Sequence, residues 1–313
     1  MLIDVSTMTH QTRFDIVTVG HFAIDTIDSP KMTQVTTSVG GPPTYVSVAA
    51  ARLGAKVAVI SKVGSDFPEE YLDWLQKNNV NLSGLKQVRD RATTRFTLKY
   101  QTTWKRKLQL KARAPAITAS DAPSSLKAQV VHLAPIAGEL QTEVVRKLRK
   151  SATLVSLDPQ GFIRSFTKHG SVRHKRWIDP SVLELADVYK SSIHEIRMVT
   201  RTASLTQAAT RIQDYGVRIV IVTQGMRGSV LLFDEVFQKV PACKPQALVD
   251  PTGAGDAYIG AFLAEYLKNK DPFWCACVGS AMASFVVEKI GPDGFGDREN
   301  TYTRAREIYE KHA

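Results

Sequence analysis

A glycine-rich stretch near the C-terminus, VDPTGAGDAYIGAF (residues 249–262), combines the features of an anion-binding site with a carboxylate. Glycines permit positive φ angles and close approach to bare backbone N–H groups. An apolar helical pattern follows at once, and the first N–H groups of a helix have no intrahelical acceptor and attract anions. The backbone N–H groups of Gly253, Ala254, Gly255 and Asp256 are therefore expected to form a cradle for a phosphate group.

Asp256 is the residue of this stretch that is expected to take part in chemistry. Phosphoryl transfer requires a cradle for the transferred group and a base for the attacking hydroxyl. A carboxylate beside the cradle is placed to accept that proton. The alternative is an ordinary acidic residue in the first turn of a helix, which the helix dipole favours. Asp250 fits a different role, as a turn residue that positions the loop.

The composition is that of a soluble globular protein, with 313 residues, 43% hydrophobic and 23% charged. No apolar run reaches the roughly 18 residues of a membrane span, and the N-terminal residues lack a signal-peptide pattern. The three cysteines are an odd number, which favours reduced thiols and a cytoplasmic location. We expect no membrane partner.

The formal net charge of +11 allows two explanations. One is nucleic-acid binding, and the other is attraction of an acidic substrate such as a polyphosphate. The basic residues are spread along the chain, with one denser run at residues 99–113. We therefore expect no nucleic-acid partner, and most of the lysines are expected to be solvated surface residues.

Strand-like and helix-like patterns alternate along the chain, which indicates a parallel sheet covered on both faces. We predict one α/β domain over residues 1–313, with a doubly wound, mostly parallel central sheet. Ligands bind such sheets beyond the carboxyl ends of the strands. The expected strands are 14–20, 57–64, 128–135, 152–159, 186–191 and 218–225, and the expected helices are 44–54, 68–79, 139–150 and 204–216.

Two segments, 22–39 and 91–113, break this alternation, because polar residues alternate with Thr, Val, Phe and Tyr. They are predicted to be exposed antiparallel strands that project from the domain as a small lid. Gly40 and Gly41 follow the first segment and are expected to act as a hinge and to allow close approach of substrate. Exposed strand edges can pair between subunits, so a homodimer through the lid is a further expectation.

Three of these stretches together resemble the ribokinase (PfkB) family of carbohydrate kinases. They are DPTGAGDAYIGAF, the glycine pair in VGGPPTYVSVAAARLGA (39–55) and TQGMRGS (223–229). The resemblance extends from about residue 14 to residue 290, whereas a P-loop of the GxxxxGK[ST] kind is absent. It implies that ATP is the phosphate donor and that Asp256 is the catalytic base.

The same resemblance implies roles for residues elsewhere in the chain. Asp25 would hold substrate hydroxyls, because a carboxylate accepts two of them, although it is equally readable as a loop aspartate. Thr223, Gly225 and Gly228 would line the phosphates and ribose of ATP. The stretch 279–294 resembles the helix and loop that flank the adenine, although an apolar helix of this kind is more often simply core.

The magnesium motif of the family, Asn-x-x-Glu, is present here only in part. KSSIHEIR (190–197) places Ser192 where the Asn is expected and keeps Glu195. Mg²⁺ usually keeps several waters and needs only one or two carboxylates, so Glu195 is predicted to bind it through water.

The acceptor is indicated by a substitution and by a second resemblance. Tyr45 stands where many family members have an Asn, which removes an amide that would contact a sugar. SLDPQGFIR (156–164) and HLAPIAGE (132–139) resemble the inositol-kinase branch and would place Gln160 and Arg164 near the pocket, unless they lie in a surface loop. We therefore expect an ATP-dependent kinase of a small polyol or sugar, with myo-inositol as acceptor. Alternatives are a nucleoside, ribose, fructose or keto-deoxy sugar acid kinase, or a non-catalytic sugar-binding member of the family.

Overall fold

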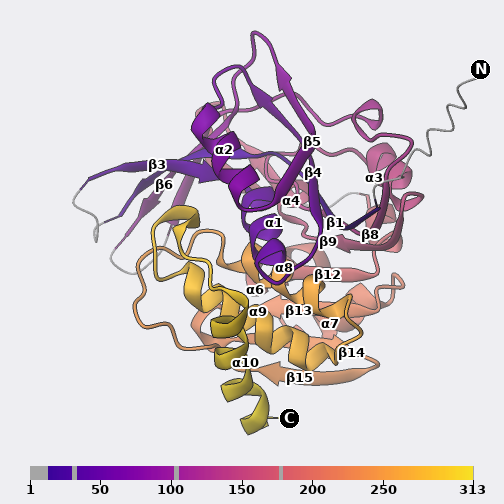
Figure 1. The fold of residues 1–313 in the computed structure, drawn as a ribbon. Helices are drawn as coiled ribbons and strands as arrows, with labels where there is room; N and C mark the ends of the chain where they lie inside the picture. The colour runs from indigo at the N-terminus through magenta and orange to yellow at the C-terminus, as the bar shows by residue number, and fades with distance from the viewer. Residues whose placement is uncertain (1–12, 30–33, 102–105, 176–178, 313) are drawn as a thin grey trace, which may run out of the picture.

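A nine-stranded sheet runs through the middle of the molecule in the computed structural model, which describes residues 13–29, 34–101, 106–175 and 179–312 (Figure 1). Its strands are β1 (Arg13–Val19), β4 (Val57–Gly64), β5 (Val80–Val88), β8 (Lys127–Leu133), β9 (Ala152–Leu157), β12 (Val188–Ser192), β13 (Ile219–Thr223), β14 (Ser229–Phe233) and β15 (Val236–Val240). They lie in the order β15-β14-β13-β12-β9-β8-β1-β4-β5. All are parallel to their neighbours except β14 and β15, which are antiparallel.

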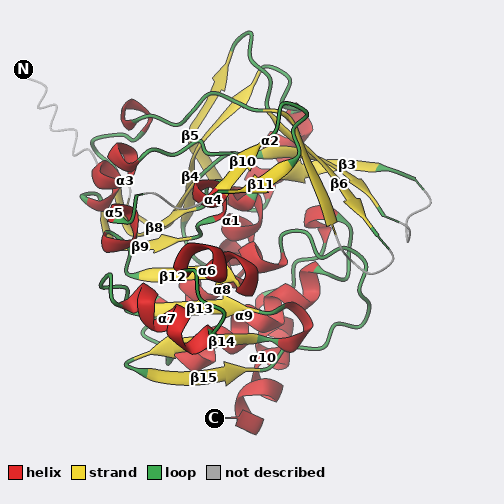
Figure 2. Ribbon diagram, turned by 180° about the vertical axis from the view of Figure 1, so that it is seen from behind, coloured by secondary structure: helices red, strands yellow, loops and turns green. Residues whose placement is uncertain are grey.

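The strands of this sheet are apolar along their length because helices cover both faces, so side chains on either face are buried. In β1, Ile16 packs into one hydrophobic cluster, whereas Val17 and Val19 pack into another on the opposite face. On the first face lie α1 (Pro42–Arg52), α2 (Glu69–Lys77), α8 (Ala254–Tyr266), α9 (Pro272–Val286) and α10 (Arg298–His312) (Figure 1). On the second face lie α3 (Thr142–Arg149), α5 (Ser181–Glu184), α6 (Ile193–Thr200) and α7 (Leu205–Gln213), as Figure 2 shows from behind. The predicted α/β fold is confirmed.

Helices α1 and α8 pack against each other with little space between their backbones. A Cβ atom at Gly260 of α8 would lie 2.3 Å from the backbone oxygen of Val46 in α1, so only glycine fits there. Both helices carry residues of the site described below at their N-terminal ends.

A smaller four-stranded sheet projects from the main body, in the order β3-β2-β6-β7 (Figure 1). Its strands are β2 (Ala23–Asp28), β3 (Thr36–Gly40), β6 (Thr94–Tyr100) and β7 (Arg106–Ala112). They coincide with the two predicted lid segments, 22–39 and 91–113, except that β3 extends one residue further to Gly40. Residues 30–33 and 102–105 of these segments lie outside the described residues. The prediction of purely antiparallel strands is wrong in one respect, because β2 and β6 pair in parallel. That pairing joins two segments far apart in the sequence, which alternation within one segment does not reveal.

Short elements complete the fold. The turn α4 (Gln160–Ile163) leads into a two-stranded sheet of β10 (Arg164–Phe166) and β11 (Val172–His174). Cys243, Cys275 and Cys277 are buried and unpaired, in agreement with reduced thiols. Among the described helices, none combines the length and the apolar character needed to cross a membrane.

Candidate active site

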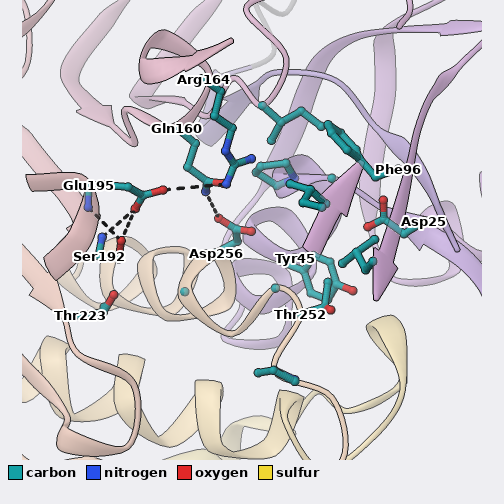
Figure 3. Close-up of a pocket in the computed structure, with 18 of the residues that line it drawn as sticks. Asp25, Tyr45, Phe96, Gln160, Arg164, Ser192, Glu195, Thr223, Thr252 and Asp256 are labelled. Carbon is teal, nitrogen blue, oxygen red and sulfur yellow. Dashed lines mark hydrogen bonds and ion pairs between the residues drawn. The ribbon is translucent and has the colours of Figure 1, made fainter. Parts of the chain in front are cut away.

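A cavity of about 260 Å³ lies between the small sheet, the carboxyl ends of β12 and β13, and the N-terminus of α8 (Figure 3). Parallel sheets bind ligands at this edge. The cavity brings together most of the predicted site residues, namely Asp25, Gly41, Tyr45, Gln160, Arg164, Glu195, Thr223, Gly253, Gly255 and Asp256.

The loop before α8 has the geometry expected of an anion cradle. Gly253, the N-cap of α8, is left-handed, with φ 74°. A Cβ at this position would also lie 2.2 Å from the Tyr45 ring, so both space and conformation require glycine. Asp250 orders the loop as predicted, because its carboxylate accepts hydrogen bonds from the backbone N–H groups of Thr252 (2.9 Å) and Gly291 (3.0 Å).

The backbone N–H groups of the first turn of α8 differ in whether they have a hydrogen-bond acceptor within the protein. Ala254 donates a long 3.4 Å hydrogen bond to the Pro251 carbonyl oxygen. Helix geometry leaves the N–H groups of Gly255 and Asp256 without an intrahelical acceptor, because the first intrahelical bond runs from Ala257 to Gly253. In this turn, these are the two N–H groups that helix geometry leaves available to an anion.

Asp256 lies in the first turn of α8, with its side chain 14% exposed. The Gln160 amide donates a 3.3 Å hydrogen bond to its Oδ1 atom. Burial raises the pKa of Asp256 to about 6, against the opposing effect of the Lys190 ammonium group. A carboxylate with such a pKa is mostly ionised at neutral pH and is a stronger base than an exposed aspartate.

Asp25 lies across the cavity from Asp256, on β2 of the small sheet (Figure 3). It is 5% exposed, and its Oδ2 atom occupies the space that a Cβ at Gly40 would take, 1.9 Å from that position. Gly41 has a positive φ of 84° and is the N-cap of α1. The glycine pair thus lets the small sheet, the Asp25 carboxylate and α1 meet in one place.

Tyr45 packs against neighbouring residues of the core and also lines the first cavity. Its ring lies beneath Gly253 and is tilted against the ring of Phe295, 6.1 Å away between centroids. Burial raises the pKa of Tyr45 well above the usual value, so the phenol is a neutral hydrogen-bond donor. Its oxygen is buried and has no hydrogen-bond partner among the described residues. A buried hydroxyl of this kind is costly unless a ligand pairs with it.

Glu195 forms a capping box with Ser192 at the start of α6. Its Oε2 atom accepts hydrogen bonds from the Ser192 N–H (2.9 Å) and hydroxyl (2.7 Å). Its Oε1 atom lies 3.9 Å from the Arg164 guanidinium, and the side chain is 13% exposed. In the described part of the chain, no three His, Cys, Asp or Glu residues cluster as a metal site. Oε1 retains the capacity to accept from a metal-bound water, which fits Mg²⁺ held mainly by waters and phosphate.

A second cavity, of about 410 Å³, adjoins the first on the other side of the α8 N-terminus. Thr223 and Gly255 line both cavities, so the two meet at the cradle. The predicted nucleotide residues Gly225 and Gly228 line the second cavity, and so do Ser280, Ala283, Ser284 and Val287 of the predicted adenine-flanking stretch. The stretch is therefore both core and cavity wall.

Several lining residues were not predicted from the sequence. Lys190, Phe96, Leu98 and Thr252 line the first cavity, and the 242–248 loop lines the second. Lys190 had a detectable signal, because a lysine in the middle of a short buried strand is rarely tolerated without a partner. The apolar residues had none, since core and cavity wall use the same residue types.

The pfkB family of carbohydrate kinases matches residues 13–295, most of the chain. The chain belongs to this family. The kinase is thus a phosphotransferase that acts on a hydroxyl group of a carbohydrate or nucleoside, and family membership implies ATP as the donor. The predicted family and reaction type are confirmed.

Curated relatives of the kinase include nucleoside kinases. It is 30% identical to the cytidine kinase of Thermococcus kodakarensis, over 88% of this chain and 97% of that protein. It is 28% identical to a nucleoside kinase of Methanocaldococcus jannaschii, over 95% of this chain and 97% of that protein. These relatives span nearly the same length as the kinase.

Solved structures share the fold. A pyrophosphate-dependent kinase in the ribokinase family, complexed with a pyrophosphate analogue and myo-inositol, has a TM-score of 0.79 at 23% identity and covers 92% of this chain and 99% of its own. The M. jannaschii nucleoside kinase has a TM-score of 0.75 at 24% identity, covering 94% and 98%. At these identities the likeness concerns the fold alone.

Proposed function

We propose that the kinase phosphorylates a hydroxyl group of a compact polyol, with myo-inositol as the leading candidate. The observation that carries the proposal is the facing arrangement of polar groups in the first cavity (Figure 3). Asp25 and the unpartnered Tyr45 phenol lie on one side, and Gln160, Arg164 and Asp256 on the other. A ring with hydroxyls on all edges can be held from both sides at once, and hydrogen-bonded hydroxyls give strong discrimination.

In this proposal each residue has one task. Asp25 accepts hydrogen bonds from two neighbouring hydroxyls of the acceptor, while Gln160 and Arg164 donate from the opposite wall. Asp256 takes the proton of the attacking hydroxyl. At the same time, the oxygen of that hydroxyl bonds to the γ-phosphorus, and the bond between the γ-phosphorus and the β-phosphate oxygen breaks. The α8 cradle stabilises the charge on the transferred group. Phe96 and Leu98, both buried in the small sheet, exclude water from the acceptor side.

Mg²⁺ would be bound by Glu195 through water and by the donor phosphates. When bound, it supplies neutralisation of the phosphate charge. The short capping-box bonds from Ser192 fix the Glu195 carboxylate in one orientation.

A nucleoside is the second candidate acceptor, and two observations favour it. Phe96, Leu98 and Leu108 give the small sheet an apolar surface over the cavity, on which a base can pack. The 30% identical relative is named a cytidine kinase. In that case Asp25 would hold the ribose hydroxyls and the base would lie under the small sheet.

A substrate panel tests the proposal, with ATP consumption as the readout and equal concentrations of competing acceptors. It contains myo-inositol, cytidine, adenosine, ribose, fructose and a keto-deoxy sugar acid. We expect the highest kcat/KM with myo-inositol. Faster phosphorylation of cytidine would replace it with the nucleoside candidate, and absence of turnover with all of them would exclude every acceptor of the panel, myo-inositol included.

Tyr45 variants sharpen the same test. Tyr45→Phe removes only the unpartnered hydroxyl, so it should leave folding intact and lower kcat/KM for the preferred acceptor by about tenfold, as expected for one buried hydrogen bond. Tyr45→Asn restores the amide and should shift preference toward ribose. Tyr215→Phe, at an exposed position, is the matched control. Unchanged relative rates in both Tyr45 variants would show that Tyr45 does not contact the acceptor.

A further inference from the structure

Lys190 is a buried cation beside the candidate base. It lies on β12 in the interior of the nine-stranded sheet, with its side chain 4% exposed. Its Nζ atom is 2.8 Å from Oδ2 of Asp158, which is fully buried, and 3.9 Å from Oδ1 of Asp256. Lysine is almost never fully buried unless it is paired. Here one ammonium group is shared by two carboxylates. Of these two, Asp158 is fully buried and Asp256 has a side chain that is 14% exposed.

The chain makes room for this lysine at the start of α8. A Cβ atom at Gly255 would lie 2.8 Å from the Lys190 Nζ atom. The ammonium group therefore lies directly against the turn that carries Asp256. A larger residue at this position would push the lysine out of its present place, so glycine allows the ammonium group to lie against the turn and leaves the cradle N–H groups accessible.

Asp158 anchors the lysine from the other side. Its second oxygen, Oδ1, accepts a hydrogen bond from the Gln160 backbone N–H (3.1 Å), which fixes the carboxylate at the end of β9. His132 lies behind it and donates to or accepts from Ser156. Burial lowers the pKa of His132 to about 3, so this histidine is neutral and gives no competing positive charge. Lys190 is therefore the cation that compensates Asp158.

The charged groups that act on Asp256 come from four elements. Lys190 of β12 and Arg164 of β10 favour its ionised form. Asp158, after β9, and Glu195 of α6 disfavour it. Among these four, Lys190 acts most strongly, so its removal would leave Asp256 in a buried site with an excess of negative charge.

We propose that Lys190 is a positioning residue whose ammonium group, anchored by Asp158, holds Asp256 in the ionised form that accepts the acceptor proton. This rests on the proposed role of Asp256 as the base. The proton of the attacking hydroxyl moves to the Asp256 carboxylate, which becomes neutral. Lys190 then remains paired with Asp158, so no buried charge is left without a partner during the reaction.

The test measures the ionisation of Asp256 in variants that should shift it in opposite directions. Lys190→Met removes the favourable charge and should raise the pKa of Asp256 by at least about one unit. Asp158→Asn removes an unfavourable charge and should lower it. The primary readout needs no substrate: ¹³C NMR titration of the Asp256 carboxyl carbon, assigned by its disappearance in Asp256→Asn.

A double variant keeps the test decisive if Lys190→Met leaves Asp158 unpaired and the protein fails to fold. Lys190→Met with Asp158→Asn removes both charges of the buried pair, which is often tolerated. Its Asp256 pKa should still lie above that of the unmodified kinase, because the Lys190 ammonium group is in direct ion-pair contact with Asp256, at 3.9 Å, and lies 2.8 Å from Asp158. Lys127→Met, at an exposed position, is the control and should change nothing.

Kinetics supply the second readout, with the panel acceptor that shows the fastest turnover. The acid limb of kcat/KM should move with the NMR titration, whereas KM for ATP stays within a few-fold. An unmoved Asp256 titration in the double variant, or shifts of the same sign in Lys190→Met and Asp158→Asn, would overturn the proposal. Loss of ATP affinity without a titration shift would instead make Lys190 a phosphate ligand. If Asp256→Asn kept full activity, the base assignment would fail, yet the NMR result would still report on Lys190.

Discussion

The two cavities on either side of the α8 N-terminus differ in kind. The first is lined by ionisable side chains, including Asp25, Arg164, Lys190, Glu195 and Asp256. The second is lined mostly by small and apolar residues and by backbone, and in it Cys243 and Tyr258 have pKa values raised by burial. The first cavity has the groups for proton transfer and hydroxyl recognition, whereas the second offers shape and apolar contact. Chemistry and donor binding should therefore be separable by mutation.

The largest expected effect is in the first cavity. Asp256→Asn should lower kcat by about 10²–10⁴-fold, because a positioned base contributes that much to proton transfer. ATP binding, measured by calorimetry, should be nearly unchanged, since the second cavity, which we predict to bind the nucleotide, is untouched. The same change at the exposed Asp214 is the control. Near-full turnover by Asp256→Asn would remove Asp256 from the catalytic role.

The pH dependence should follow the same residue. Because burial raises the pKa of Asp256 to about 6, the base is ionised above pH 6 and protonated below it. We expect kcat/KM to be level above about pH 7 and to fall about tenfold per pH unit well below pH 6. A pH–rate profile measures this, with protein integrity checked at each pH by circular dichroism. A level profile down to pH 5 contradicts the prediction.

A smaller effect is expected in the second cavity, where a mutation should change KM for ATP instead of kcat. Ala283→Leu adds bulk to its wall and should raise KM for ATP by about tenfold, equivalent to about 1.4 kcal/mol. The KM for the acceptor should stay the same, because the first cavity is unaltered. Ala203→Leu, on an exposed loop, is the matched control. Equal changes in both KM values would show that the cavities are not independent.

The least drastic test concerns the small sheet over the first cavity, which we predict to be a lid. Tyr100 of β6 already contacts the cradle loop, with its hydroxyl 2.8 Å from that of Thr252. Hydrogen exchange in β2, β3, β6 and β7 should slow when acceptor and a non-hydrolysable ATP analogue are both bound. The exchange of α3, on the far face, serves as internal reference. Identical exchange with and without ligands would leave the small sheet without a closing role.

Site residues that are close together in the sequence could be predicted, whereas those that depend on strand pairing could not. Asp250, Gly253 and Asp256 are close in sequence and have local tasks, so their spacing predicts their geometry. Gln160 follows the end of β9, where parallel sheets place functional groups, whereas Asp25 comes soon after β1 in the sequence but lies within β2 of the small sheet. By contrast, Lys190 depends on the pairing of β12 with β9, and the parallel pairing of β2 with β6 joins distant segments. Such relations arise from tertiary contacts, and the sequence of either segment alone does not contain them.

The tight crossing of α1 and α8 at Gly260 determines which parts of the molecule can move. Gly40 and Gly41 precede α1, and the cradle with Asp256 begins α8. The close backbone contact between the two helices therefore holds these two parts of the site as one rigid unit. Interiors packed this closely transmit displacement instead of absorbing it. We therefore expect opening for substrate entry to involve the small sheet, and the packing of α1 against α8 to stay unchanged.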